Sequence, residues 1–339
     1  MFQAQYPWIT LNFDAKGTGL AIAAAQSGTD DMLLVHSPSQ ELTFMNGGYG
    51  VDRKIIAQNF FIIVGPASDP AHINGLTNVT QALLNIYNAA QNNSAVPANQ
   101  QVLWFSRNDI SGTNTKEISL WNTALTGTGI TYNNLNTTAY NSWFKCTGTG
   151  MGPTLLATNY YGSVGGYTLS DTGTYYAYYD KGDINLQIDV QGQQSLLNVY
   201  SAIIDNPQVT SLANTHFNAS LTFVNWLVST AGQTAIQNYG KASFNQSLFA
   251  PFIPLATNPT SNATLYSWIQ SYAYMAYNTT SSKAYITASG TECPTQFQYN
   301  AGSLYSATFD TPAVIVYQSL LSNVISDVNQ IILERPQES

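Results

Sequence analysis

The sequence predicts an α/β fold, because apolar runs of strand length alternate along the chain with segments of helical spacing. Met32–Val35 and Phe60–Val64 are short, uninterrupted apolar runs of the kind that form buried strands. Pro38 stands at a position suited to the first turn of a helix, and Phe217–Thr230 has apolar residues along one helical face. This alternation indicates parallel sheets, whose ligands bind beyond the carboxyl ends of the strands.

Further elements follow the same pattern, along a chain whose 339 residues suffice for two α/β domains or one large one. We expect strands at 9–13, 102–105, 167–169, 186–190 and 199–204. We expect helices at 17–25 and 82–90, and others that begin at Thr113 and after the glycine-rich turn 148–152.

The composition points to an extracellular or cell-surface protein. Charged residues make up 8% of the chain, against roughly 25% in a typical soluble domain, so amide and hydroxyl side chains must solvate the surface. The net charge of −8 argues against nucleic acid as a partner, because phosphate binding needs clustered Lys and Arg. A small anion would have to be held by local dipoles rather than by the overall field.

The chain shows no membrane-spanning or secretory segment of its own. No apolar run reaches the ~18 residues needed to cross a bilayer. Met1–Pro7 lacks the basic and apolar regions of a signal peptide. An extracellular composition without a signal peptide leads us to expect further sequence upstream of Met1.

The two cysteines, Cys146 and Cys293, allow two interpretations. An even number in an extracellular chain is compatible with one disulfide that closes a long loop, and the alternative is two unrelated buried thiols. A chain so rich in Asn, Ser and Thr contains several glycosylation sequons by chance, so they permit glycosylation without demonstrating it. The sequons begin at Asn78, Asn92, Asn136, Asn218, Asn245, Asn262 and Asn278.

The segment Ser106–Thr113 combines several groups that bind anions. It contains Arg107, one of only three arginines in the chain, together with hydroxyl side chains and a glycine. It lies between the apolar run 102–105 and a helix for which Thr113 is a suitable N-cap, where backbone N–H groups and the positive end of the helix dipole meet. A guanidinium adds a fixed charge suited to a tetrahedral oxyanion. The alternative is an ordinary loop in which Arg107 pairs with Asp109.

Two other turns are rich in Ser or Gly and also follow expected strands, one at Ser37 and one at Gly148–Gly152, so that all three turns can face one ligand.

The sequence gives little support for metal binding, nucleotide binding or catalysis. The three histidines have no metal-ligand spacing, and the chain lacks a phosphate-binding Gly-x-x-x-x-Gly-Lys motif and a Gly-x-Ser-x-Gly nucleophile elbow. We therefore expect no metal, no cofactor and no enzyme activity.

Short segments spread along the chain carry a family resemblance. They are Leu33–Pro38, Gly48–Arg53, Asn59–Pro66, Asp69–Ala71, Ser106–Thr113 with Lys116–Glu117 and Leu120–Trp121, Gly150–Leu155, Tyr167–Asp171, Asn198–Tyr200 and Phe223–Leu227. Each is weakly specific alone. As an ordered set that covers roughly residues 8 to 250, they resemble the periplasmic or extracellular tungstate-binding proteins of ABC transporters.

The resemblance implies a two-lobed type II periplasmic-binding-protein fold with a C-terminal extension. One lobe would contain residues 1–65 and 197–252, the other 66–196, and the extension 253–339. The implied function is capture of a tetrahedral oxyanion, tungstate or molybdate, for the membrane permease of an ABC importer. By motif, the implied ligand residues are Ser37, Arg107, Ser111 and Thr113, with Gly150, Met151 and Gly152 at a turn of the binding site.

The chain departs from the family pattern at three places. The Thr-Thr-Thr-Ser turn that follows the family's first strand is absent, Asn108 replaces a Gly, and Thr172 replaces an Arg. Without that first strand, a central position in the sheet of lobe one would be empty and ladder hydrogen bonds would be lost in the interior. We therefore expect residues upstream of Met1, or another segment or chain, to supply the strand.

Residues 253–339 lie outside the resemblance. Residues 266–277 are expected to be helical, and Thr311–Pro312 begins a segment with a 3-4 apolar spacing, which favours a second helix that packs on its own lobe or on another subunit. The β-branched run 313–317 is the alternative, a strand added to its own sheet or to a neighbour's. The spaced apolar positions are Val314, Tyr317, Leu321, Val324, Val328 and Ile331. Self-association through 253–339 would fit a second candidate function, an extracellular structural or filament-forming protein built on a binding-protein fold.

Overall fold

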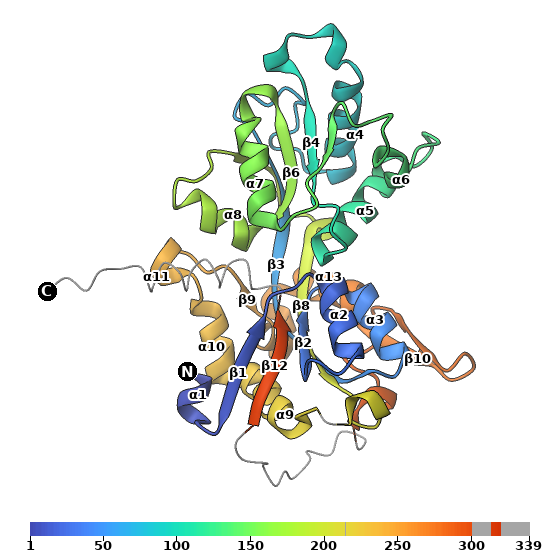
Figure 1. Ribbon diagram of the computed structural model, residues 1–339, viewed down its shortest axis with the longest axis vertical. Helices are drawn as coiled ribbons and strands as arrows, with labels where there is room; N and C mark the ends of the chain where they lie inside the picture. The colour runs from blue at the N-terminus through green and yellow to red at the C-terminus, as the bar shows by residue number, and fades with distance from the viewer. Residues whose placement is uncertain (214, 300–312, 320–339) are drawn as a thin grey trace, which may run out of the picture. The chain divides into compact units, whose positions relative to one another are not determined.

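The computed structural model describes residues 1–213, 215–299 and 313–319, and it confirms the α/β class (Figure 1). The chain forms two compact units. Unit 1 contains Met1–Gln58 and the described residues of Val199–Ser322, and the described part of unit 2 is Asn59–Asn198. Strands β3 (Gly50–Gly65) and β8 (Leu197–Asp205) carry the chain between the units.

The elements that complete each unit are as follows. Unit 1 begins with α1 (Phe2–Gln5), β1 (Ile9–Asp14), α2 (Thr18–Gln26), β2 (Met32–Val35) and α3 (Pro38–Asn46). Unit 2 contains α4 (Val79–Gln91), β4 (Leu103–Ser106), α5 (Gly112–Ala124), α6 (Tyr132–Leu135), β5 (Phe144–Cys146), α7 (Met151–Tyr160), β6 (Gly166–Asp171), α8 (Thr172–Tyr179) and β7 (Gln187–Val190). Unit 1 continues with α9 (Phe217–Val228), α10 (Thr230–Asn238), α11 (Lys241–Phe244), β9 (Ala250–Pro251), α12 (Ile253–Thr257), α13 (Ala263–Ala273), β10 (Met275–Asn278), β11 (Lys283–Ile286) and β12 (Ala313–Ser319).

The sheet of unit 1 has the strand order β1-β12-β2-β8-β3, and β9 pairs with β3. β12 is parallel to both of its neighbours. β8 is antiparallel to β2, so the predicted parallel arrangement is wrong at this pair. The physical reason is that β8 enters directly from unit 2, without the crossover helix that a parallel strand requires.

The segment Ala313–Ser319 is a strand, so the favoured expectation of a helix is wrong there and the strand alternative is right. A run of β-branched residues fits an interior sheet position better than a helix, because its χ1 angles are restricted. The remainder of the expected helix, 311–312 and 320–331, lies outside the described residues. β12 occupies an interior position between β1 and β2, which is the kind of gap that another segment was expected to fill (Figure 1).

The sheet of unit 2 has the strand order β3-β6-β4-β5, and β7 also pairs with β3. β4 is parallel to both β6 and β5, whereas β3 is antiparallel to β6 and β7. Aromatic rings fill the core on one side of this sheet. Trp104 of β4 and Trp121 of α5 meet edge to face with centroids 5.2 Å apart, and both side chains are fully buried. This packing fixes α5 on the strand that precedes it.

The part of the extension from 253 to 299 is bound to unit 1 through a buried arginine. Arg53 forms an ion pair with Glu41 at 2.8 Å, and its Nη1 donates to the carbonyl groups of Ala273 at 3.0 Å and Glu292 at 2.7 Å. The expected helix over 266–277 is correct up to Ala273 and wrong beyond it. There the chain forms the β10–β11 hairpin, whose backbone pairing ends the helix.

Candidate functional site

Three helices of unit 2 begin at the same edge of its sheet. β6, β4 and β5 are parallel neighbours, so their carboxyl ends meet at one edge. β4 leads through residues 107–111 into α5, β5 leads through 147–150 into α7, and β6 leads directly into α8. The start of a helix presents unpaired N–H groups and the positive end of the helix dipole, so this edge is suited to an anion.

The side chain of Asp109 organises the loop between β4 and α5. Its Oδ1 accepts hydrogen bonds from the Ser111 hydroxyl at 2.6 Å and from the Ser111 N–H at 3.3 Å. The Ser111 oxygen accepts the N–H of Asn114 at 3.2 Å, so Ser111 is the N-cap and the expectation for Thr113 is wrong. Thr113 is the second residue of α5, and its N–H and that of Gly112 have no acceptor within the helix.

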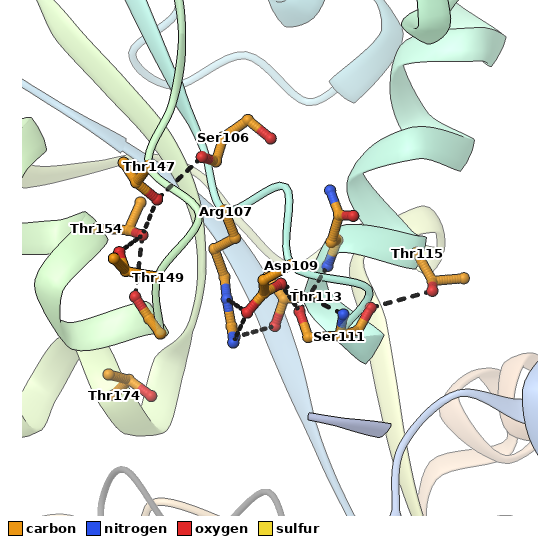
Figure 2. Close-up of polar contacts among 12 residues, drawn as sticks. Ser106, Arg107, Asp109, Ser111, Thr113, Thr115, Thr147, Thr149, Thr154 and Thr174 are labelled. Carbon is orange, nitrogen blue, oxygen red and sulfur yellow. Dashed lines mark hydrogen bonds and ion pairs between the residues drawn. The ribbon is translucent and has the colours of Figure 1, made fainter. Parts of the chain in front are cut away.

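Arg107 lies between the first turn of α5 and the turn that leads into α7 (Figure 2). Its Nε and Nη2 donate to Asp109 Oδ2, Nε at 3.0 Å, and its Nη1 donates to Thr113 Oγ1 at 3.3 Å. The residue is only 6% exposed. The pairing of Arg107 with Asp109, one of the two sequence interpretations, is therefore present. Because a guanidinium has five N–H donors, these contacts fix its orientation without using all of its donors.

The turn that leads into α7 is tied to the Arg107 loop by its backbone. The N–H of Thr147 donates to the carbonyl of Ser106, and the N–H of Gly148 donates to the carbonyl of Arg107, both at 2.9 Å. Gly148 has φ +63, in the left-handed region that favours glycine. The hydroxyl groups of Thr147 and Thr154 are hydrogen-bonded at 2.8 Å, so hydroxyl side chains gather at this turn (Figure 2).

The three expected ligand residues of this turn, Gly150, Met151 and Gly152, take different positions at the start of α7. Gly150 is the N-cap of α7, and Met151 and Gly152 are its first two residues. The side chain of Met151 is 1% exposed and packs with Leu155 in the apolar core, so only its backbone is available to a ligand. A Cβ at Gly152 would lie 2.0 Å from the hydroxyl of Tyr178, so a larger residue here would force the Tyr178 side chain to move.

At the start of α8, an N–H group of the helix already has a hydrogen-bond acceptor within the protein. Asp171 is its N-cap and accepts the N–H of Thr174 at 2.9 Å and the Thr174 hydroxyl at 2.7 Å. The carboxylate adds negative charge at this helix start, and Thr172 brings no positive charge to it. The N-termini of α5 and α7 are therefore better placed than that of α8 to bind an anion.

A buried carboxyl group links β4 to the first turns of α5. Glu117 is 2% exposed, and it accepts the indole N–H of Trp104 at 2.7 Å and the hydroxyl of Ser106 at 2.9 Å. Burial raises the pKa of Glu117 to about 7. The Asn114 amide and the Ser106 hydroxyl both hydrogen-bond the Tyr132 hydroxyl at 2.9 Å. This network holds the end of β4 and the start of α5 in one arrangement.

The loop between Arg107 and Ser111 contains two non-glycine residues in the left-handed region. Asn108 has φ 47 and Ile110 has φ 51. Asparagine tolerates this region well, which explains why Asn108 can stand where the family pattern has Gly. The amide of Asn136 donates to Asn108 Oδ1 at 3.0 Å and supports it. Ile110 is β-branched and 60% exposed, so its conformation is strained without compensating burial.

Ser37 belongs to unit 1, whereas the other expected ligand residues belong to unit 2. It is the N-cap of α3, and Pro38 is at the first helical position as expected. Its side chain makes no capping hydrogen bond and is 4% exposed.

Cys146 and Cys293, for which a disulfide was one of the two interpretations of the sequence, are both free thiols in the structure. The thiol of Cys146 donates to Asn136 Oδ1 at 2.9 Å on the surface of unit 2. Cys293 is buried in unit 1, where its thiol lies 3.7 Å from the carbonyl of Pro294 and 3.6 Å from that of Phe297. Two free thiols agree with the second interpretation, unrelated buried thiols, except that Cys146 is exposed.

Most of the expected sequons lie on the surface. Asn218 is half-buried, and its Oδ1 is enclosed without a hydrogen-bond partner. Two of the exposed sequon residues cap helices: Asn78 accepts the N–H of Gln81, and Asn262 accepts the N–H of Leu265, both at 3.1 Å. The exposed sequon residues are Asn78, Asn92, Asn136, Asn245, Asn262 and Asn278.

The described part of the chain lacks both a membrane-spanning helix and a cluster of metal ligands. Among residues 1–213, 215–299 and 313–319, no helix has the length and apolar character to span a membrane. The same residues contain no group of three or more His, Cys, Asp or Glu side chains that could hold a metal ion.

Comparison with known proteins places the chain in a family. A model of the PBP superfamily domain matches residues 1–231. This chain belongs to the PBP superfamily. Within the superfamily, it is 34% identical over 239 residues to the tungstate-binding protein TupA of Peptoclostridium acidaminophilum, with 70% of this chain and 73% of that protein covered. The chain is therefore a member of the family that contains the TupA proteins, and the resemblance seen in the sequence is confirmed.

Two further comparisons agree with this membership in the PBP superfamily. The solved structure of the tungstate-binding protein TupA from Desulfovibrio alaskensis G20 matches with a TM-score of 0.56 and 34% identity, over 74% of this chain and 89% of that one. A putative ABC transporter anion-binding protein of Haloferax volcanii is 34% identical over 230 residues, or 66% of this chain. The match spans 59% of the length of the Haloferax relative.

The sequence analysis of this PBP-superfamily chain missed several residues that shape the site. Glu117 entered only as part of a family segment without a role, and Tyr132 was not noted, because a charge and a phenol on helical segments usually face solvent. The threonines at 147, 149 and 154 carry a weak signal, a hydroxyl-rich turn after a predicted strand. Asp109 was noted only as a partner for Arg107, whereas it also fixes Ser111.

Proposed function

We propose that this chain captures a tetrahedral oxyanion, tungstate or molybdate, at the edge of unit 2 where α5 and α7 begin. The observation that carries the proposal is the fixed position of Arg107, which Asp109 and Thr113 hold beside the first turn of α5. The family membership supports the same ligand class, since its relatives are named tungstate-binding proteins.

The proposed donors are of two kinds. Backbone N–H groups come from Gly112 and Thr113 in α5 and from Met151 and Gly152 in α7, which have no acceptor within their helices. The guanidinium of Arg107 adds charge-assisted hydrogen bonds, which are the stronger ones. Local donors of this kind suit a chain with a net charge of −8, which does not attract anions through its overall field.

The hydroxyl groups contribute unequally to the proposed site. The Ser111 hydroxyl donates to Asp109 and accepts from Asn114, so we assign Ser111 a positioning role and not that of a donor to the ligand. The Thr113 oxygen accepts from Arg107, which leaves its own hydrogen for the anion. Ser37 remains a proposed ligand residue, because its hydroxyl makes no capping bond in α3.

The proposed biological setting follows from the family. A substrate-binding protein hands its ligand to a membrane permease of an ABC importer, so we propose that permease as the partner and a periplasmic or extracellular location. We propose that units 1 and 2 correspond to the two expected lobes, 1–65 with 197–252 and 66–196. The proposed activity is binding without catalysis, and glycosylation is proposed only for the exposed sequons.

Thermal unfolding of the full chain with tungstate, molybdate, sulfate or phosphate tests this function. A ligand at 100 times its Kd stabilises the folded state by about 2.7 kcal/mol, which is measurable as a rise in Tm. We expect tungstate and molybdate to raise the Tm at micromolar concentration and sulfate and phosphate to do so only at far higher concentration. Equal shifts with all four anions, or none, would contradict the proposal.

A further inference from the structure

β12 occupies an interior position in the sheet of unit 1 but comes from a distant part of the chain. It is paired in parallel with β1 over six residue pairs, from Ile9↔Ala313 to Asp14↔Gln318. It is also paired in parallel with β2, from Tyr317↔Met32 to Ser319↔Leu34. Figure 1 shows β12 between β1 and β2. The slot between these two strands is thus shaped for one extended segment in parallel orientation.

Both the slot and the strand require a partner. Without β12, the facing edges of β1 and β2 would each present a row of unpaired backbone N–H and C=O groups. With β12 in place, Met32 and Leu33 of β2 are fully buried, and they are the positions that pair with β12. The segment Ala313–Ser319 contains no charged residue and is rich in β-branched residues, which makes it prone to pair with any open strand edge.

The chain before β12 is anchored at a defined point. The N–H of Tyr299 donates to Asp52 Oδ1 at 3.0 Å, and the ring of Tyr299 packs against Phe217 with centroids 4.5 Å apart. Residues 300–312 then separate Tyr299 from Ala313. At roughly 3.3–3.6 Å per residue, a chain of this length reaches at most about 50 Å. This length is the upper limit on how far Ala313 can lie from Tyr299 in any arrangement of the chain.

We propose that β12 is exchanged between copies of this chain, so that the slot between β1 and β2 accepts Ala313–Ser319 of a second copy in the same parallel register. The strand contacts are the same whether the strand comes from the same chain or from a copy. Tether length and protein concentration therefore decide between the two arrangements. Each copy gives one strand and accepts one, which produces a closed dimer if the exchange is reciprocal and an open chain of subunits if it is not.

Disulfide trapping in the full-length chain tests this exchange without any ligand, so its result is independent of the proposed oxyanion function. Leu11 and Ile315 are paired positions, at a strand separation that a disulfide can bridge. Two populations are prepared in a Cys146→Ser, Cys293→Ala background, one with Leu11→Cys and the other with Ile315→Cys. They are unfolded, mixed, refolded together and oxidised. A disulfide between the two populations forms in register only when β12 enters the slot of another copy.

We expect the disulfide-linked product of two chains to rise severalfold as the protein concentration is raised tenfold. Leu20→Cys replaces Leu11→Cys in the control, because Leu20 is exposed on α2 and reports random collision. A chain that carries both Leu11→Cys and Ile315→Cys shows whether β12 reaches the slot at all, and the pair Thr10→Cys with Val314→Cys repeats the test if the first variant fails to fold. A disulfide only within single chains, or yields no higher than the control, would overturn the proposal.

Discussion

The carboxylate of Asp109 accepts the guanidinium of Arg107 on one oxygen and the hydroxyl of Ser111 on the other. The Asp109 side chain thereby holds the side chains of both Arg107, two positions before it, and Ser111, two positions after it. One of them carries the positive charge of the proposed site, and the other caps the helix whose N–H groups would share the ligand. These contacts within the protein constrain the loop, which lowers the cost of ordering it when an anion binds.

Replacement of Arg107 should weaken oxyanion binding strongly. Loss of one partner from a buried charge pair costs on the order of 2–5 kcal/mol, so Arg107→Gln should raise the Kd for tungstate by at least roughly tenfold. Lys181→Gln is the control, because Lys181 is an exposed cation of the same unit. Titration calorimetry of both variants measures the effect. A similar Kd for the two variants would place the site elsewhere.

Gly152→Ala should disturb the start of α7. The added Cβ would lie 2.0 Å from the Tyr178 hydroxyl, so either the tyrosine or the first turn of α7 must move. We expect a stability loss of about 1–3 kcal/mol and a weaker affinity for tungstate. Gly162→Ala is the matched control, since a Cβ there meets no atom within 4 Å. Chemical denaturation and calorimetry compare them, and equal behaviour of the two variants would show that Gly152 is not constrained.

Ile110→Gly should relieve strain in the Arg107 loop. A residue with a Cβ in the left-handed region costs about 1–2 kcal/mol relative to the right-handed one, and the exposed Ile110 side chain offers little packing to lose. We expect the free energy of unfolding to stay equal or rise by up to about 1 kcal/mol. Leu156→Gly, at an exposed position inside α7, should instead lower it by roughly 1 kcal/mol. A loss at Ile110 as large as that at Leu156 would argue against strain.

The stability of the protein should fall as the pH rises from about 4.5 to about 7, and Glu117 should account for part of this fall. Its pKa is raised from 4.5 to about 7 by burial, so the folded state holds a proton that the unfolded state has released in this range. The contribution is fully present below pH 4.5, decreases by up to about 1.4 kcal/mol per pH unit, and is lost above pH 7.

Urea unfolding of the wild type and Glu117→Gln at pH 5 and pH 8 measures this contribution. The glutamine keeps one acceptor oxygen for the indole N–H of Trp104 and places an N–H donor beside the Ser106 hydroxyl, as a protonated carboxyl group would, but it does not titrate. Lys116, whose pKa burial lowers to about 7, acts in the opposite direction but is present in both proteins, so it cancels in the comparison. We expect a smaller loss of stability from pH 5 to pH 8 in the variant. An equal loss in both would assign the pH dependence to other groups.

Local patterns were sufficient to predict most elements of unit 2. The apolar run before Arg107 is β4, and the turn at 148–152 leads into α7, because short buried strands and glycine-rich helix starts are encoded by neighbouring residues. The pattern of hydroxyl and charged residues in Ser106–Thr113 led to Arg107 and, as one of two interpretations, to its pairing with Asp109, and the family motif gave Arg107 its expected ligand role. The N-cap of α5 is Ser111 and not the predicted Thr113, because Asp109 orients the Ser111 hydroxyl.

Other features depend on contacts between distant parts of the chain. The strand identity of Ala313–Ser319 is set by its pairing with β1 and β2, since the 3-4 spacing of its apolar residues also fits a helix and periodicity alone does not decide between the two. The antiparallel β8 results from the return of the chain into unit 1. The role of Glu117 depends on Trp104 and Ser106, which lie on another element, so no local pattern indicates it.

Titration calorimetry of the full chain with tungstate, first alone and then in the presence of excess sulfate, tests the central claim most directly. The account predicts one tungstate bound per chain, with an affinity that sulfate changes little in the wild type and that Arg107→Gln lowers at least roughly tenfold. Absence of heat with tungstate for a folded chain, or displacement of tungstate by an equal concentration of sulfate, would contradict it.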